Sequence, residues 1–442
     1  MSVTATKSAH PYVASLLAGS AAVPASPASW LNTRRAAALE RANALSVPTT
    51  RDEEWRFTDL TPLTKVQFQP VSAAADVAES DIAAFNVPEA AVRLTFVDGI
   101  YAPALSVRSK LPAGITVELL AGDHNEALKT HAALIEPHLA QLATDEHDLF
   151  TALNTAYLQQ GVFIHAAKNT AFKQPIHLLF VATRKGAAVH PRCLVVAESG
   201  SECCVIEDYV TLGEDTGLTN AVTEVAVAAN ASVRHIKLQR ENNAAFHISN
   251  CAVTLARDAR YLAHAVTFGA RLSRNNLTVI QQGEGAHAQM DGIALIGGRQ
   301  LADTHTLMDH TQPHGTCEQV HKTIVGGGAH AVFNGKVFVR EGAQQTDSSQ
   351  QSHNLLLSDK AHVDTKPQLE IFADDVKCAH GATVGQIDAE NLFYLLSRGL
   401  PEAAARNLLT YAFGAEIIDR IPVPSLVAQL EKNVMARTEG GV

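Results

Sequence analysis

The stretch GAHAVFNGKVFV, residues 328–339, contains the pattern that decides the fold of this 442-residue chain. A small residue between polar ones, Ala329, precedes a short apolar segment of the kind that forms β-strands. The same pairing returns along the chain, and the small residues are Ala171, Gly200, Ala231, Ala259, Ala286, Ala329 and Ala361. Their spacing stays close to one period, except that the interval from Ala286 to Ala329 is markedly longer than the others. A repeat of about 30 residues, as here, is typical of a solenoid.

Strands rather than helices fill each period, so the solenoid is predicted to be a β-helix over residues 161–387. Small residues suit its corners, where stacked coils approach closely, while Val, Ile and Leu fill its narrow core. The interval from Ala286 to Ala329 is interpreted as one long coil. A β-sandwich is the alternative, but its turns recur every ~8–12 residues and give no reason for a longer period. The repeat therefore favours a mainly β fold of the β-helix type.

The region before the β-helix, residues 1–160, is predicted to be mainly helical. The expected helices cover residues 29–45, 124–143 and 148–160. Between the first two, Asp98-Gly99 separates two alternating segments, which is a strong hairpin signal. This region is therefore expected to form a helical domain with one small hairpin.

The C-terminal region, residues 388–442, is predicted to be helical again. Asp388 can cap its first helix and Gly399 can end that helix. In the next helix one apolar stripe repeats at every fourth position, and its members are Ala405, Leu409, Phe413 and Ile417. We expect this stripe to cover the open end of the solenoid, because an uncapped β-helix exposes an edge that aggregates. Part of the stripe could instead present a surface to a partner.

Composition and charge exclude several classes of function. The formal net charge is -10 and no Lys/Arg cluster stands out, so neither nucleic acid nor an anionic membrane surface is an expected partner. No apolar run approaches the ~18–20 residues of a membrane span, and the N-terminus lacks the dense apolar run of a signal peptide. A cytoplasmic protein is expected. Its six cysteines are then thiols, serving as core residues or ligands.

Several common catalytic motifs are missing from the sequence. There is no GxxxxGK[ST] loop for ATP, no GxSxG elbow, no HExxH and no CxxC pair. Cys193 and Cys251 have apolar neighbours and are expected in the core. In a strand, Cys203 and Cys204 point to opposite faces, so at least one of them should also be buried.

The densest group of potential metal ligands is DTHTLMDHTQPHGTC, residues 303–317. It offers His305, His310, His314 and Cys317, and imidazole and thiolate are good ligands for zinc or iron. Nearby carboxylates could fix the tautomers of the rings. The alternative is that these residues lie on successive coils and face outward. Spacing alone does not supply a metal site here.

A second candidate is DDVKCAHGATVG, residues 374–385, which contains Cys378 and His380. In an extended segment, positions i and i+2 share a face, so the thiol and the imidazole should lie side by side. A thiolate beside an imidazole can bind iron. Spacing alone leaves the choice between a site and a simple turn open.

The segment DDVKCAHGATVGQIDAENLFYLLSRG, residues 374–399, closely resembles the C-terminal signature of the SufB/SufD family, the scaffold proteins of the Suf iron–sulfur cluster assembly system. The resemblance continues upstream through residues 354–377, through HAVFNGKVFVREGAQQTDSSQQSHN and through the segment that starts at Asp303. Near the N-terminus PTTRDEEWRFTDL, residues 48–60, also matches. Within the family the chain is most similar to the D-type subunit, because no cysteine precedes Cys193 and glycine follows His380.

The resemblance implies a right-handed parallel β-helix flanked by helical regions, acting as a non-enzymatic scaffold. It also implies a complex with one SufB-type subunit and two copies of a SufC-type ABC ATPase. The ATPase subunits would bind the C-terminal helical region, which gives Ala405, Leu409 and Phe413 a possible role in partner binding. Sulfide would arrive through the SufB-type subunit from a cysteine desulfurase. Alone, the chain could form a homodimer.

The family also supplies roles for the Cys378–His380 pair. His380 matches a residue that would bind iron of a nascent iron–sulfur cluster at the interface with the SufB-type subunit, which would supply the remaining ligands. Cys378 would be a nearby thiol in assembly or metal capture. No cofactor is expected in the isolated chain. The family supplies no ligand role for His305, His310 or His314, which we expect to be structural.

Three other functions remain to be weighed. A β-helix enzyme acting on polysaccharide would be secreted and rich in aromatic residues, whereas aromatic residues make up 5% of this chain. A trimeric β-helix metalloenzyme with shared His ligands would show hexapeptide repeats, which the spacings do not support. A pure interaction scaffold without any iron ligand remains the main alternative.

Overall fold

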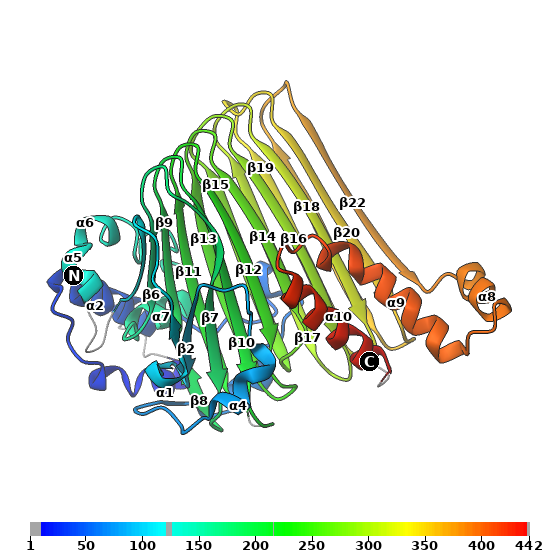
Figure 1. The fold of residues 1–442 in the computed structure, drawn as a ribbon, viewed down its shortest axis with the longest axis horizontal. Helices are drawn as coiled ribbons and strands as arrows, with labels where there is room; N and C mark the ends of the chain where they lie inside the picture. The colour runs from blue at the N-terminus through cyan, green and yellow to red at the C-terminus, as the bar shows by residue number, and fades with distance from the viewer. Residues whose placement is uncertain (1–9, 121–125, 215, 440–442) are drawn as a thin grey trace, which may run out of the picture.

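The computed structural model describes residues 10–120, 126–214 and 216–439, and two long, largely parallel sheets dominate it (Figure 1). Sheet A consists of β5 (Ile115–Leu119), β6 (Val162–Ala166), β9 (Arg192–Ala197), β11 (Leu218–Val227), β13 (Phe246–Leu255), β15 (Leu272–Gln281), β17 (Leu301–His310), β19 (His330–Val339) and β21 (His362–Ile371), with β1 (Gln69–Pro70) and β8 (Ala187–Val189) at its side. Sheet B consists of β2 (Val92–Val97), β3 (Ile100–Tyr101), β7 (Ala171–Ala182), β10 (Glu202–Thr211), β12 (Ser232–Arg240), β14 (Arg260–Thr267), β16 (His287–Ile296), β18 (Thr316–Val325), β20 (Asp347–Leu356) and β22 (Lys377–Gln386), with β4 (Val107–Arg108) beside β2.

From β9 onward consecutive long strands alternate between the two sheets, which is the arrangement of a β-helix. Each strand pairs in parallel with the strand one coil later; Leu301 of β17, for example, pairs with His330 of β19. In sheet B, His287 of β16 pairs in the same way with Thr316 of β18. The predicted β-helix and its period are therefore confirmed.

The long interval from Ala286 to Ala329 is not one long coil, as predicted, but a coil and a half. Ala286 precedes β16 in sheet B, whereas Ala329 precedes β19 in sheet A. The equivalent of Ala286 one coil later is Gly315, and Ala329 follows half a coil after it. The small residues up to Ala286 lie at the start of strands of sheet B, whereas Ala329 and Ala361 precede strands of sheet A.

Seven corner residues with positive φ, which we call the corner row, precede strands of sheet B in successive coils. They are Asn169, Gly200, Asn230, Asp258, Gly285, His314 and Gln345, with φ between 56° and 71°. Each donates its backbone N–H to a carbonyl of the next coil, as in the 2.9 Å bond from Asn230 to Arg257. Gly, Asn and Asp tolerate this conformation best, which explains their presence at most of these corners.

The interior of the solenoid is a narrow apolar core with polar side chains along part of it. The largest buried cluster contains Val195, Val253, Val279 and Val337 from sheet A, facing residues such as Val205 from sheet B. The small residues Ala231, Ala259, Ala286 and Ala329 are fully inaccessible at the corners, as expected for positions where coils meet closely.

The N-terminal region covers the outer faces of the first coils, mostly on sheet A, while Ile82 packs against Leu179 and Val210 of sheet B. Its helices are α1 (Pro11–Leu17), α2 (Ser29–Ala44), α3 (Thr61–Thr64), α4 (Glu79–Ile82), α5 (Glu126–Thr130), α6 (Ala132–Ile135) and α7 (Leu149–Ala156), and its 3-10 turns are η1 (Ser20–Ala22), η2 (Glu53–Trp55), η3 (Ala83–Phe85) and η4 (Pro103–Leu105). Leu153 of α7 and Leu16 of α1 share a buried cluster with Phe246 and Leu272 of sheet A. The hairpin at Asp98-Gly99 is confirmed, with φ of 50° and 79° at the turn.

The helix predicted over residues 124–143 is wrong in its second half. Residues 124 and 125 lie outside the described part of the chain, and helix is present only in α5 and α6. From Ala140 to Ala143 four successive backbone N–H groups donate to the carboxylate of Glu224, at 2.8–3.0 Å. This buried carboxylate of β11 also pairs with Arg192, so a tertiary contact replaces the local helical bonds.

The C-terminal helices are α8 (Ala389–Ser397), α9 (Glu402–Ile418) and α10 (Pro424–Glu439). Asp388 caps α8 by accepting from the backbone of Asn391 at 2.8 Å, and Gly399 follows α8 with φ of 90°, as predicted. No helix in the described residues is long and apolar enough to cross a membrane.

The apolar stripe of α9 does not cover the open end of the solenoid, contrary to our expectation. Helices α9 and α10 lie across the outer face of sheet B (Figure 1). There Ile417 and Leu426 share a buried cluster with Ile293 and Ile324 of the sheet. These outward-facing strand residues are apolar, and burying them under the helices removes their side chains from water, which stabilises the fold. The end of the solenoid is left uncovered by the described residues.

Candidate functional site

The uncovered end of the solenoid is formed by β21 and β22, the last strands of the two sheets. Among the described residues each has a hydrogen-bonded neighbour on one side only, β19 for β21 and β20 for β22. Figure 1 shows β22 at the edge of the stack, with α8 extending beyond it. Two adjacent edges of this kind are a ready template for pairing with another chain.

Cys378 and His380 lie side by side on β22 at this end. In the parallel ladder Cys378 pairs with Ser348 and His380 pairs with Gln350. Ser348 and Gln350 are buried inside the solenoid, so Cys378 and His380 share the face that continues the interior wall. Cys378 is half-buried against the core, whereas His380 is exposed. Their predicted placement on one face is confirmed, while their role as ligands stays a prediction.

Two columns of polar side chains lead inward from this pair. Beneath Cys378 lie Ser348 and Cys317, and beneath His380 lie Gln350 and Gln319. Gln350 donates from Nε2 to Oε1 of Gln319 at 3.3 Å. The open end of the solenoid at β22, which we call the mouth, is therefore polar, whereas the next layer of the same two columns is formed by the apolar side chains of Ala288 and Met290.

The two thiols of this column differ in their surroundings. Burial raises the pKa of the Cys317 thiol to about 12, so this thiol is protonated at neutral pH. Burial also raises the pKa of Cys378, although a hydrogen bond with the backbone of Ser348 opposes the shift. Cys378 is the more accessible of the two, and a metal ion would have to displace its proton.

The histidines of residues 303–317 do not converge on a metal site. His305 projects from the outer face of β17, whereas His310 is buried at its end and hydrogen-bonds Gln281 at 2.7 Å. His314 belongs to the corner row, and Cys317 points into the core. The structural roles expected for these histidines agree with their separate positions.

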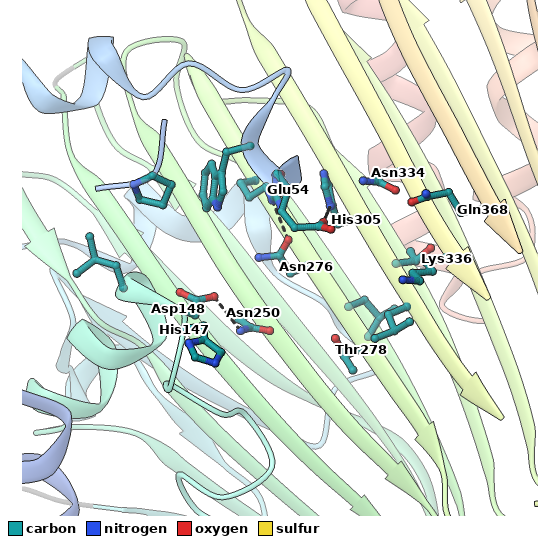
Figure 2. Close-up of a pocket in the computed structure, with 17 residues that line it drawn as sticks. Glu54, His147, Asp148, Asn250, Asn276, Thr278, His305, Asn334, Lys336 and Gln368 are labelled. Carbon is teal, nitrogen blue, oxygen red and sulfur yellow. Dashed lines mark hydrogen bonds and ion pairs between the residues drawn. The ribbon is translucent and has the colours of Figure 1, made fainter. Parts of the chain in front are cut away.

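His305 lies instead in a groove of about 390 Å³ between sheet A and the N-terminal segment (Figure 2). Polar side chains from successive strands of sheet A line one wall of this groove, and they include Asn250, Asn276, Asn334 and Gln368. Glu54 and Trp55 close the groove on the side of the N-terminal segment. The groove is therefore lined by a mixture of amide, ionisable and apolar side chains.

Four ionisable groups on one side of this groove form a connected set of ion pairs. Arg274 donates to Asp303 at 2.5 Å and lies over the ring of Trp55, 4.4 Å from its centroid. His305 contacts Asp303 through Nε2 at 3.0 Å and Glu54 through Nδ1 at 3.2 Å. Burial disfavours ionisation of Asp303, but Arg274 and His305 outweigh it and lower the pKa of Asp303 to about 2. These contacts clamp the N-terminal segment onto the sheet.

The remaining cysteines are core residues. Cys203 belongs to the interior cluster, while Cys204 faces outward beneath the C-terminal helices, so the predicted opposite orientation is confirmed and both are buried. Cys193 and Cys251 are buried in the interior, as expected. Burial raises the pKa of Cys203 and of Cys204 to about 12, which makes them poor nucleophiles.

One group of potential metal ligands was missed by the sequence analysis. Within residues 10–120, 126–214 and 216–439, only His330, His362 and Asp364 bring three ligand atoms of His, Cys or carboxylate side chains within 4.8 Å of one another. The signal was present in the repeat itself, because both histidines directly follow a corner alanine, in GAHAV and KAHVD.

Comparison with known proteins adds to this geometry. The family model described as the SufBD core domain of SUF system FeS cluster assembly matches residues 180–413, and that of the SufBD protein N-terminal region matches residues 6–178. An iron–sulfur cluster assembly SufBD family protein of Synechocystis is 39% identical over 93% of this chain and 92% of its own length. The iron–sulfur cluster assembly protein SufD of Escherichia coli is 34% identical over 91% and 92%, and SufD of Bacillus subtilis is 27% identical over 91% and 92%.

Proposed function

Because this chain belongs to the SufBD family of iron–sulfur cluster assembly proteins, we propose that it is a D-type scaffold subunit that offers Cys378 and His380 to a nascent cluster. One observation carries the proposal: both side chains stand together at the uncovered mouth of the solenoid, on an edge strand that lacks a second neighbour among the described residues. The cluster is cargo that is built there and passed on. The chain itself would perform no catalysis.

The donor types fit an iron–sulfur cluster. Thiolate is the usual ligand of such clusters, and imidazole replaces it at some irons. Two side chains fill only part of the coordination of a cluster, so the other ligands must come from a second chain. A SufB-type subunit that pairs with the free edge of β22 would bring its own side chains to the same mouth.

A SufC-type ATPase is the second partner in this proposal, docked on the C-terminal helices. Of the predicted contact residues, Ala405 is buried, and Leu409 and Phe413 are half-buried, with Phe413 packed against the cluster on sheet B. The large apolar side chains that remain exposed on α8 and α9 are Phe393, Tyr394 and Leu396 of α8 and Leu408 of α9, exposed by 72%, 56%, 38% and 42%. A docking role for Ala405, Leu409 and Phe413 stays a prediction.

The test is the content of iron and acid-labile sulfide per complex. The chain is co-expressed with SufB-type and SufC-type subunits, purified without oxygen, and compared with His380→Ala and Cys378→Ser. We expect His380→Ala to assemble normally but to lose iron and sulfide together, and Cys378→Ser to reduce both. His353→Ala is the matched control. His353 is a partly exposed histidine on the neighbouring strand β20, and its side chain lies on the outer face of the sheet, away from the interior wall that carries Cys378 and His380.

Unchanged iron and sulfide in the His380→Ala complex would instead support the pure interaction scaffold, in which this chain only holds its partners together. Failure of the complex to form is recognised separately by its subunit stoichiometry. In that case His380→Gln, which keeps a polar side chain at the position, replaces the alanine variant, and the same two contents are measured on its complex.

A further inference from the structure

A group of metal-binding side chains that the proposed function does not use lies on the outer face of sheet A, in its last two coils. His330 is the first residue of β19 and pairs in the ladder with His362, the first residue of β21. Asp364 is two positions after His362 and therefore projects from the same face of the strand. Two adjacent strands thus present three potential ligands at the corners of a small triangle.

The side chains of this triangle already converge. Asp364 Oδ2 lies 2.7 Å from Nε2 of His330 and 3.1 Å from Nε2 of His362. The two imidazole rings are 4.9 Å apart between centroids and inclined by 48°. Ligand atoms about 2.1 Å from a common ion stand ~3.0–3.4 Å apart, so small rotations of these side chains would admit one ion.

The donor set is selective. Two imidazoles and one carboxylate suit borderline divalent ions such as Zn²⁺ and Fe²⁺, while Ca²⁺ and Mg²⁺ prefer a shell of oxygen atoms. Three protein ligands leave positions open for water or for a group from another molecule. The arrangement therefore favours an accessible transition-metal site over a closed structural one.

The backbone beneath the triangle is held by hydrogen bonds and by a close contact between two corners. The N–H of His330 donates to Gln300 at 2.9 Å, and that of His362 donates to Ala329 at 3.0 Å. Just before β19, Gly327 has φ of 59°, and a Cβ there would meet the backbone of Gly298 at 2.8 Å. The close contact between these two corners holds the start of β19 in place, so the ligands are anchored before any ion arrives.

The ladder position of these histidines is occupied by apolar residues in the coils that the N-terminal region covers, and by histidine in the coils beyond it. The equivalent residues in the two preceding coils are Leu272 and Leu301, which pack with the N-terminal region. In the last two coils the position carries histidine, and the side chains of His330 and His362 are 27% and 65% exposed. An ion from solvent can therefore reach both rings.

Ion pairing gives only a weak alternative reason for the cluster. A solvent-exposed pair contributes about 0–1 kcal/mol to stability, and a histidine takes part as a cation only when protonated. A bound divalent ion would use all three groups at once, with both imidazoles neutral.

We propose that His330, His362 and Asp364 form a binding site for one divalent transition-metal ion of the Zn²⁺/Fe²⁺ class. This site is distinct from Cys378 and His380. His362 begins β21 whereas Cys378 lies on β22, which starts beyond the far end of β21, and a strand of this length spans ~30 Å. The two sites can therefore be tested separately.

The experiment is calorimetric titration of the purified full chain with Zn²⁺, in a Cys378→Ser/His380→Ala background that removes the other site. We expect one ion to bind per chain. His330→Ala/His362→Ala should weaken binding on the order of 100-fold or more, and Asp364→Asn by at least about 10-fold. His287→Ala/His353→Ala is the matched control, since it removes two other partly exposed histidines from sheet B and should leave the affinity unchanged.

A second probe reports which atoms bind. Co²⁺ added to the same background protein should give a spectrum without the intense sulfur-to-metal charge-transfer absorption of thiolate ligation. Unchanged Zn²⁺ affinity in both His330→Ala/His362→Ala and Asp364→Asn would overturn the proposal, as would a thiolate spectrum with Co²⁺. Circular dichroism of each variant checks that the β-helix is retained, and these surface substitutions should leave it intact.

Discussion

Backbone conformation at single residues accounts for much of the regularity of the solenoid. The corner row repeats a positive φ once per coil, and each member passes a backbone hydrogen bond to the next coil. Residues with a Cβ adopt this conformation at a cost of roughly 1–2 kcal/mol, and β-branched residues adopt it least readily. The corners therefore restrict which residue types the repeat can hold.

Asn230→Val tests this restriction. We expect it to lower the free energy of unfolding by about 1–2 kcal/mol, because the branched side chain is forced into the left-handed region at φ of 59°. Asn230→Gly at the same position should change stability by less than about 0.5 kcal/mol. Urea midpoints of the two variants and wild type provide the measurement, and equal midpoints for Val and Gly would contradict the argument.

A pH dependence follows from the clamp around Asp303. Burial disfavours the charged ring of His305, but the contacts with Asp303 and Glu54 outweigh it and raise the pKa of His305 above the ordinary 6.5. A raised pKa adds stability that is complete below pH 6.5 and is lost as the pH rises through the folded value. The lowered pKa of Asp303, about 2, adds stability above pH 3.8 that is lost as the pH falls toward 2.

His305→Gln should therefore lower the thermal midpoint more at pH 5.5 than at pH 8. The loss at pH 5.5 corresponds to about 1.5–3 kcal/mol, the contribution of a hydrogen bond to a charged group. His314→Gln, at an exposed corner, is the control and should show no such difference between the two pH values. A pH-independent loss in His305→Gln would mean that its packing, not its charge, stabilises the N-terminal segment.

At the scale of elements, the apolar stripe of the C-terminal helices predicts that a helix forms, but not which surface it packs against. The stripe from Ala405 to Ile417 correctly indicated a helix with one buried face. It did not indicate which surface would bury that face, because the apolar outer residues of sheet B lie far earlier in the chain. Only the stacking of coils brings Ile293 and Ile324 together beneath α9.

The two faces of α9 should respond differently to truncation. Ile417→Ala leaves a cavity against sheet B and should cost about 2–4 kcal/mol, whereas Leu408→Ala on the exposed face should change stability by less than about 0.5 kcal/mol. Denaturant unfolding measures both. If the SufC-type subunit docks as proposed, Leu408→Ala would weaken that complex without affecting the isolated chain, and an equal loss of stability in both variants would refute the assignment of the two faces.

The sequence predicts structural features that repeat or that depend on neighbouring residues. It does not predict features that are determined by contacts between residues far apart in the chain. The strands, the shared face of Cys378 and His380 and the capped helix α8 all follow from short-range patterns. The absence of helix beyond α6 does not follow from such patterns, because the backbone N–H groups from Ala140 to Ala143 donate to the buried carboxylate of Glu224. The convergence of His330 with His362 also required the register of the ladder, which the uneven repeat of the sequence leaves undetermined.

In the described part of the chain, the N-terminal region packs over the first coils of the solenoid, whereas the edges of the last coil are uncovered. Exposed apolar residues at the open end include Ile371, Phe372 and Val384, which are 39%, 58% and 48% accessible. An uncovered edge of this kind favours association with a further strand. When the SufB-type partner proposed above is absent, we expect a second copy of the chain to occupy this edge.

We therefore expect the isolated chain to self-associate in a concentration-dependent manner. Phe372→Lys/Val384→Lys should shift it toward the monomer in light-scattering measurements coupled to gel filtration, because two charges would be brought to the pairing edge. Val107→Lys is the control, as it places a charge on an exposed apolar site in the first part of the chain. Dimers that persist in the double variant would locate the contact away from the open end.

Because the parallel strands repeat, the solenoid also acts as a spacer whose length depends on the number of coils. Each coil adds one strand spacing of ~4.8 Å, whichever residues fill it. Removing one coil, about 30 residues between equivalent corners, would shorten the molecule by that step while both ends kept their own side chains. The distance between the N-terminal cover and the mouth at Cys378 and His380 can thus change in fixed increments, independently of the chemistry at either end.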